Sequence, residues 1–153
     1  MMLCKNDADL LVYYAKLQGN LLHAFGIWKE GTGDSTLKSH LNSIVTTGRT
    51  VYDSFCLCLK MADLDAPIFD ENIPGYKDIY KVLSSDKTDK EKIIYLFEKG
   101  TNGIAEIREE AESVVNSDIR KGIFSFSGYL NGVVSLLDLH LKDYELSDLR
   151  RRA

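Results

Sequence analysis

Proline is rare in this chain, and its placement constrains the fold. The two prolines, Pro67 and Pro74, are the only ones among 153 residues and lie close together. Proline disrupts a helix interior because it lacks a backbone N–H and clashes with the preceding turn. Long helices are therefore allowed everywhere except around residues 67–74, and no strand pattern is evident in the rest.

Cysteines and long apolar runs are also scarce. The three cysteines are odd in number, with Cys56 and Cys58 two positions apart and Cys4 remote. This spacing gives no disulfide framework and favours a reducing compartment. The N-terminus lacks an apolar run of signal-peptide length, and no stretch of membrane-span length is free of polar interruption. We therefore expect a cytoplasmic protein with no membrane contact.

The chain has no excess of basic charge. Lys and Arg number 19 against 23 Asp and Glu, which gives a net charge of −4. A broad nucleic-acid surface needs a basic face, so this balance argues against nucleic-acid binding. The length and the 44% hydrophobic content are ordinary for one soluble domain, which we expect to span residues 1–153.

What the chain does contain is four apolar stripes with helical spacing. In each, apolar residues recur in steps of four and three, the pattern of a helix in a bundle. We call each such stripe a seam. The predicted seams are Leu10, Tyr14, Leu17, Leu21, Ala24 and Trp28; Leu37, Leu41, Ile44, Gly48, Val51, Phe55, Cys58 and Ala62; Ile93, Phe97, Gly100, Ile104, Ile107, Ala111 and Val114; and Ile119, Ile123, Phe126, Leu130, Val133, Leu137, His140 and Tyr144.

Capping residues predict where these helices begin and end. We expect the first helix to start after Asn6 or Asp7 and to end at Gly31 in a left-handed cap. One of residues 34–36 caps the second helix, and Thr88 with Glu91 forms a capping box for the third. Residues 116–118 cap the last helix, which we expect to fray after Tyr144.

The connections favour one architecture. They are short, long and short, and short connections make neighbouring helices antiparallel. We predict an all-α, antiparallel (up-down-up-down) four-helix bundle with a long irregular connection, residues 63–87, between the second and third long helices. Gly100–Gly103 resembles a turn, but the seam continues in phase across it, so we expect one helix. Gly48 on a seam indicates a close approach by a neighbouring helix.

Known catalytic patterns are missing. None of His23, His40 and His140 follows a Glu at the spacing of di-metal bundles, and there is no zinc or haem cysteine set and no phosphate loop. His140 is expected to be a partly buried, hydrogen-bonded histidine. HEPN-type RNases are also small helical bundles, but Arg49, Arg108 and Arg120 lack the downstream histidine of that family. We assign no catalytic residue, no metal site and no cofactor.

One acidic pattern provides an enzymatic alternative. Glu106 and Glu109 lie three apart on one helix, and Glu145 and Asp148 repeat the spacing one helix later. This faintly resembles the paired carboxylates of MazG-type nucleotide pyrophosphohydrolases, all-helical enzymes that hold Mg²⁺ with such residues. The resemblance covers only these few residues and implies an Mg²⁺-dependent nucleotide hydrolase. A solvated acidic face explains the same pattern.

The irregular connection is the segment that folding explains least. It combines four carboxylates with no cation among them and three aromatic side chains, which suit contact with a basic protein partner. The expected contact residues are Asp63, Asp65, Phe69, Asp70, Glu71, Tyr76 and Tyr80. The predicted function is a small non-catalytic protein-binding module of the inhibitor, adaptor, antitoxin or immunity type. The thickened seams also leave a homodimer open.

Overall fold

The computed structural model describes residues 2–152, and it is all-helical. Its five helices make the chain 80% helical, and no strand occurs among these residues. The helices are α1 (Lys5–Gly31), α2 (Ser35–Met61), α3 (Lys77–Leu83), α4 (Asp89–Glu112) and α5 (Ser117–Arg152). The four long helices and the irregular segment before α3 all fall where the sequence predicts them.

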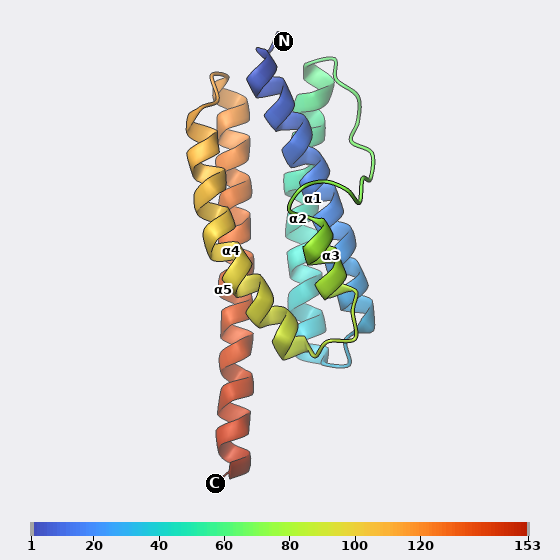
Figure 1. Cartoon of the computed structure of the whole chain (residues 1–153), viewed down its shortest axis with the longest axis vertical. Helices are drawn as coiled ribbons and strands as arrows, with labels where there is room; N and C mark the ends of the chain where they lie inside the picture. The colour runs from blue at the N-terminus through green and yellow to red at the C-terminus, as the bar shows by residue number, and fades with distance from the viewer. Residues whose placement is uncertain (1, 153) are drawn as a thin grey trace.

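The long helices pack as two hairpins (Figure 1). Helix α1 lies against α2, and α4 lies against α5, each pair joined by a short turn. The two hairpins meet mainly where α2 contacts α5, and α3 packs between α1 and α4. The last turns of α5 extend past the other helices to the C-terminus (Figure 1).

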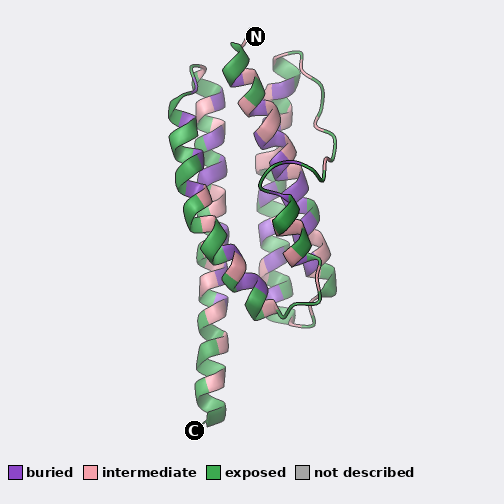
Figure 2. Ribbon diagram, viewed as in Figure 1, coloured by how far each residue is buried: buried purple, intermediate pink, exposed green. Residues whose placement is uncertain are grey.

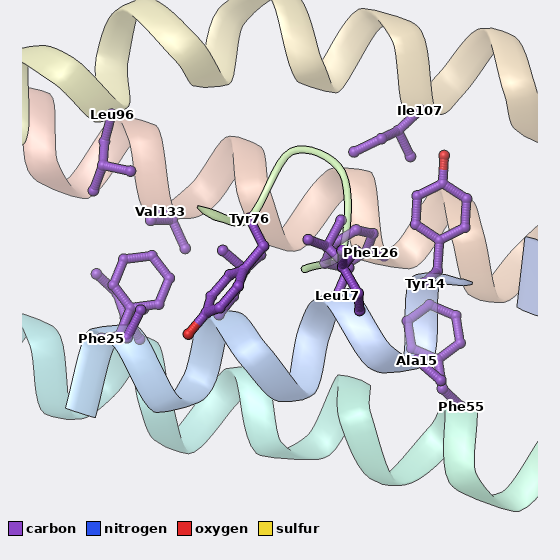
Figure 3. Packing of buried hydrophobic residues seen from close by; sticks show 14 of the residues in the cluster. Tyr14, Ala15, Leu17, Phe25, Phe55, Tyr76, Leu96, Ile107, Phe126 and Val133 are labelled. Atoms are coloured by element: carbon purple, nitrogen blue, oxygen red, sulfur yellow. The ribbon is translucent and has the colours of Figure 1, made fainter. Parts of the chain in front are cut away.

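The core follows the predicted seams closely. Helix α1 has more buried residues than any other helix. Rings from three helices meet at its first half, where Phe126 lies 5.6 Å from Tyr14 and 5.8 Å from Phe55 between ring centroids. Figure 3 shows these side chains converging from α1, α2 and α5. On α5 the seam is buried except for Leu130 and Tyr144, which are half-buried.

Helix α1 begins earlier than expected. It starts at Lys5, and the N-cap residue Cys4 makes no side-chain capping hydrogen bond within the described residues. Asp7 is instead 1% exposed and accepts hydrogen bonds from the backbone N–H groups of Val115 and Asn116, at 3.1 and 2.8 Å. The sequence prediction was wrong because the partners of Asp7 are more than a hundred residues away, in the turn between α4 and α5.

Some of the other predictions about helix ends are confirmed and some were wrong. Asp34 caps α2, the Thr88–Glu91 capping box is present, and the Asn116 side chain accepts from the N–H groups of Asp118 and Ile119. The left-handed cap at Gly31 was wrong: among residues 2–152, Gly75 is the glycine with a positive φ. The end predicted for α5 was also wrong, because the helix continues to Arg152.

Two predictions about glycines are confirmed. Helix α4 runs unbroken through Gly100 and Gly103, and Gly48 is buried with Leu22 and Tyr129 against it. One seam position on α4 was wrong, since Phe97 is 41% exposed and Leu96 is buried in its place. A Cβ at Gly100 would lie 2.7 Å from Val134 Cγ2, so α4 and α5 approach closely at this point.

Helix α5 differs from expectation in its apolar length. It is long and apolar enough to cross a membrane by length and composition, a test that a core helix of a soluble protein also passes. Only 33% of its most apolar 18-residue stretch is buried. Figure 2 shows that the C-terminal end of α5 is mostly exposed, with half-buried residues among the exposed ones.

Candidate partner-binding surface

Residues 62–76, which we call the strap, connect α2 to α3 in an irregular path. The strap leaves α2 at Asp63, whose φ of 55° is in the left-handed region. Aspartate tolerates this conformation better than most residues. The N–H groups of Asp63 and Leu64 bond back to the carbonyls of Lys60 and Leu59. The two prolines then keep the strap from becoming helical.

Contacts with α1 hold the strap in place. The Asn20 side chain donates to the carbonyl of Asp70 at 2.7 Å, and the Tyr13 hydroxyl donates to the carbonyl of Pro74 at 2.9 Å. Ile73 is 5% exposed and Tyr76 is fully buried, so both insert into the core. The strap is therefore an anchored segment with a defined surface.

The outer side of the strap is apolar at its centre. Ile68 is 76% exposed and Phe69 is 51% exposed. Phe69 packs edge-on against His23 of α1 at 5.1 Å between ring centroids, and His23 stacks on Tyr80 of α3 at 6.2 Å. A cavity of about 100 Å³ lies beneath, between Ile68 and Phe69 and the α1 and α2 side chains Asn20 and Tyr52.

Four carboxylates precede and follow this apolar centre along the strap. Asp63, Asp65 and Glu71 are exposed, and Asp70 is half-buried. No ion pair within residues 2–152 involves any of these four carboxylates. The Oδ1 atom of Asp70 accepts the N–H of Asn72 at 3.0 Å, which stabilises the turn of the strap. The other three carboxylates are exposed to solvent and available to a partner.

The predicted contact residues separate into two groups. Asp63, Asp65, Phe69 and Glu71 are exposed, and Tyr80 is half-buried beside them. Tyr76 is fully buried, so it anchors the strap and offers no contact surface. Burial, followed by the charges of Tyr80 and Glu71, raises the pKa of Tyr76 to about 12.

Sequence reasoning missed two members of this surface. Ile68 follows Pro67 directly and precedes Phe69, so an apolar pair in a proline-bounded segment was visible in the sequence. His23 lies 46 positions before Phe69 on another helix, and only the folded chain brings the two together.

The carboxylates of the enzymatic alternative are not brought together. Arg108 of α4 contacts Ser127 of α5, whereas Lys90 of α4 pairs with Asp148 at 3.5 Å. These contacts show that Glu106 and Glu109 lie beside the first half of α5, roughly 30 Å along the helices from Asp148 at 1.5 Å per residue. No group of three or more metal-ligating side chains occurs within residues 2–152.

A second polar cluster joins the α1–α2 turn to α5. Asp34 Oδ2 lies 2.9 Å from His140 Nε2 and accepts the Tyr144 hydroxyl at 2.6 Å, while Oδ1 caps α2. Burial alone would raise the pKa of Asp34, but hydrogen bonds from Tyr144, the Leu37 N–H and His140 outweigh it and lower this pKa to about 2. The expected hydrogen-bonded His140 is confirmed, at 3% exposed.

Comparisons with models of protein families, with curated proteins and with solved structures found no match to this chain.

Proposed function

We propose that this chain is a small, non-catalytic protein-binding module that recognises a basic partner through the strap. The inhibitor, adaptor, antitoxin and immunity classes all fit such a module. The observation that carries the proposal is the exposed pair Ile68 and Phe69, flanked along the strap by carboxylates that form no ion pair within residues 2–152. We infer that the module acts in the cytoplasm and without a cofactor.

The scaffold that we infer is a single antiparallel, up-down-up-down four-helix bundle. Two hairpins of long helices joined at α2 and α5 support this arrangement. The bundle holds the strap through Asn20, Tyr13 and the buried Tyr76. A fixed strap favours binding because little conformational entropy is lost when the partner docks.

The two kinds of side chain on the strap have different roles in the proposal. Apolar side chains at the centre of an interface supply most of the affinity once they are desolvated. Exposed carboxylates at the rim act mainly on the association rate, and this effect weakens with salt. Asp63, Asp65 and Glu71 provide the rim charge, whereas Ile68 and Phe69 provide the centre.

The first experiment identifies the partner by photo-crosslinking in the host cell. A photo-reactive phenylalanine analogue replaces Ile68 in one variant and Val115 in a matched control, because both side chains are 76% exposed. We expect one dominant crosslinked protein from position 68 and none from position 115. The same crosslinked protein from both positions would contradict the proposal, and so would the absence of any crosslinked protein.

The second experiment uses the identified partner and separates the two roles. Ile68→Ser with Phe69→Ser should weaken binding at least tenfold, mainly through faster dissociation. Asp63→Asn, Asp65→Asn and Glu71→Gln together should slow association and flatten its salt dependence. Val115→Ser is the control. An unchanged association rate and salt slope in the triple variant would rule out the acidic rim.

The alternative hypothesis, a nucleotide hydrolase, predicts Mg²⁺ binding at Glu106 and Glu109 of α4. Calorimetric titration with MgCl₂ tests it directly on the purified chain. We expect no saturable heat, and the same trace from Glu106→Gln with Glu109→Gln. A saturable heat that this double variant abolishes would favour the nucleotide hydrolase instead.

A further inference from the structure

We draw no further inference here: the strongest candidate, the groove of about 300 Å³ between α2 and α5 that Gly128, Gly132 and Leu136 help to line, carries nothing because no feature of residues 2–152 shows what covers it.

Discussion

Gly48 lies where side chains from two other helices press on the backbone of α2. A Cβ at this position would lie 2.7 Å from Leu22 Cδ2 and 2.8 Å from Tyr129 Cζ, and would also contact the Tyr129 hydroxyl. That hydroxyl donates to the carbonyl of Ile44 at 2.8 Å, so it cannot move away freely. The Gln18 amide donates to the carbonyl of Gly48 itself. The glycine is therefore part of a buried polar contact between three helices.

Gly48→Ala should destabilise the chain by about 1–3 kcal/mol, because overpacking outweighs the gain in helix propensity. Gly103→Ala is the matched control, since a Cβ there meets nothing within 4 Å and the residue lies inside α4. It should be neutral or stabilise by up to about 1 kcal/mol. Urea midpoints of the two variants check this difference in stability. Equal midpoints would show that the side chains around Gly48 can move aside to make room for a Cβ.

The two glycines differ in how far the sequence could predict their roles. Gly48 falls on a seam, so its periodic position alone indicated a close approach. For the strap, periodicity gives no guidance, because the segment is irregular. The sequence showed aromatic residues there, yet it could not show that Tyr76 points into the core while Phe69 points out. That choice depends on α1, through Tyr13, Asn20 and His23.

At the scale of the elements, Asp34 ties the α1–α2 hairpin to α5. One oxygen caps α2 through the Thr36 and Leu37 N–H groups, and the other accepts from His140 and Tyr144. Removing a carboxylate with so many donors would cost free energy twice, because α2 would lose its cap and the donors of His140 and Tyr144 would lose their acceptor. The α5 segment around His140 and Tyr144 therefore depends on this one side chain.

This contact should give the chain an acid-sensitive stability. The pKa of Asp34 is lowered from 3.8 to about 2 in the folded chain, so its contribution is present above pH 3.8 and is lost as pH falls through 2. The contribution is on the order of 2 kcal/mol. Urea midpoints between pH 6 and about pH 2 should fall less steeply for Asp34→Asn than for the parent. Asp7, whose pKa is also lowered, remains in both chains, so parallel curves would refute the role of Asp34.

Helix positions were predictable from the sequence because each seam repeats over many turns. Errors arose where tertiary contacts override a local signal. Phe97 was expected inside, but in the folded chain Leu96 is buried in its place. Asp7 was taken for a cap, whereas it holds the turn at Val115 and Asn116.

At the scale of the whole molecule, hydroxyl groups of tyrosine lie at several contacts between helices. Burial first, and then neighbouring charges or hydrogen bonds, raises the pKa values of Tyr14, Tyr76 and Tyr144 above 10. Burial also raises the pKa of Tyr129 to about 12, against a smaller lowering by Gln18. A group whose pKa is raised on folding stabilises the fold below its unfolded pKa and loses this effect as pH rises. The chain should therefore lose stability from about pH 10 upward.

Tyr76 allows a direct test of this alkaline loss, because its buried hydroxyl has no hydrogen-bond partner among residues 2–152. Tyr76→Phe removes that hydroxyl and should be neutral or stabilise the chain by up to about 1 kcal/mol at pH 7. Between pH 10 and 12 its urea midpoint should fall less than that of the parent. Tyr129→Phe is the control: it also loses an ionisable group, but it should be about 1 kcal/mol less stable at pH 7 because the bond to Ile44 is lost. If Tyr76→Phe were destabilised like Tyr129→Phe, the Tyr76 hydroxyl would have a partner in solution.

Retention of the ring in Tyr76→Phe should also keep the strap anchored, so partner binding through Ile68 and Phe69 should survive this change and be lost in Tyr76→Ala.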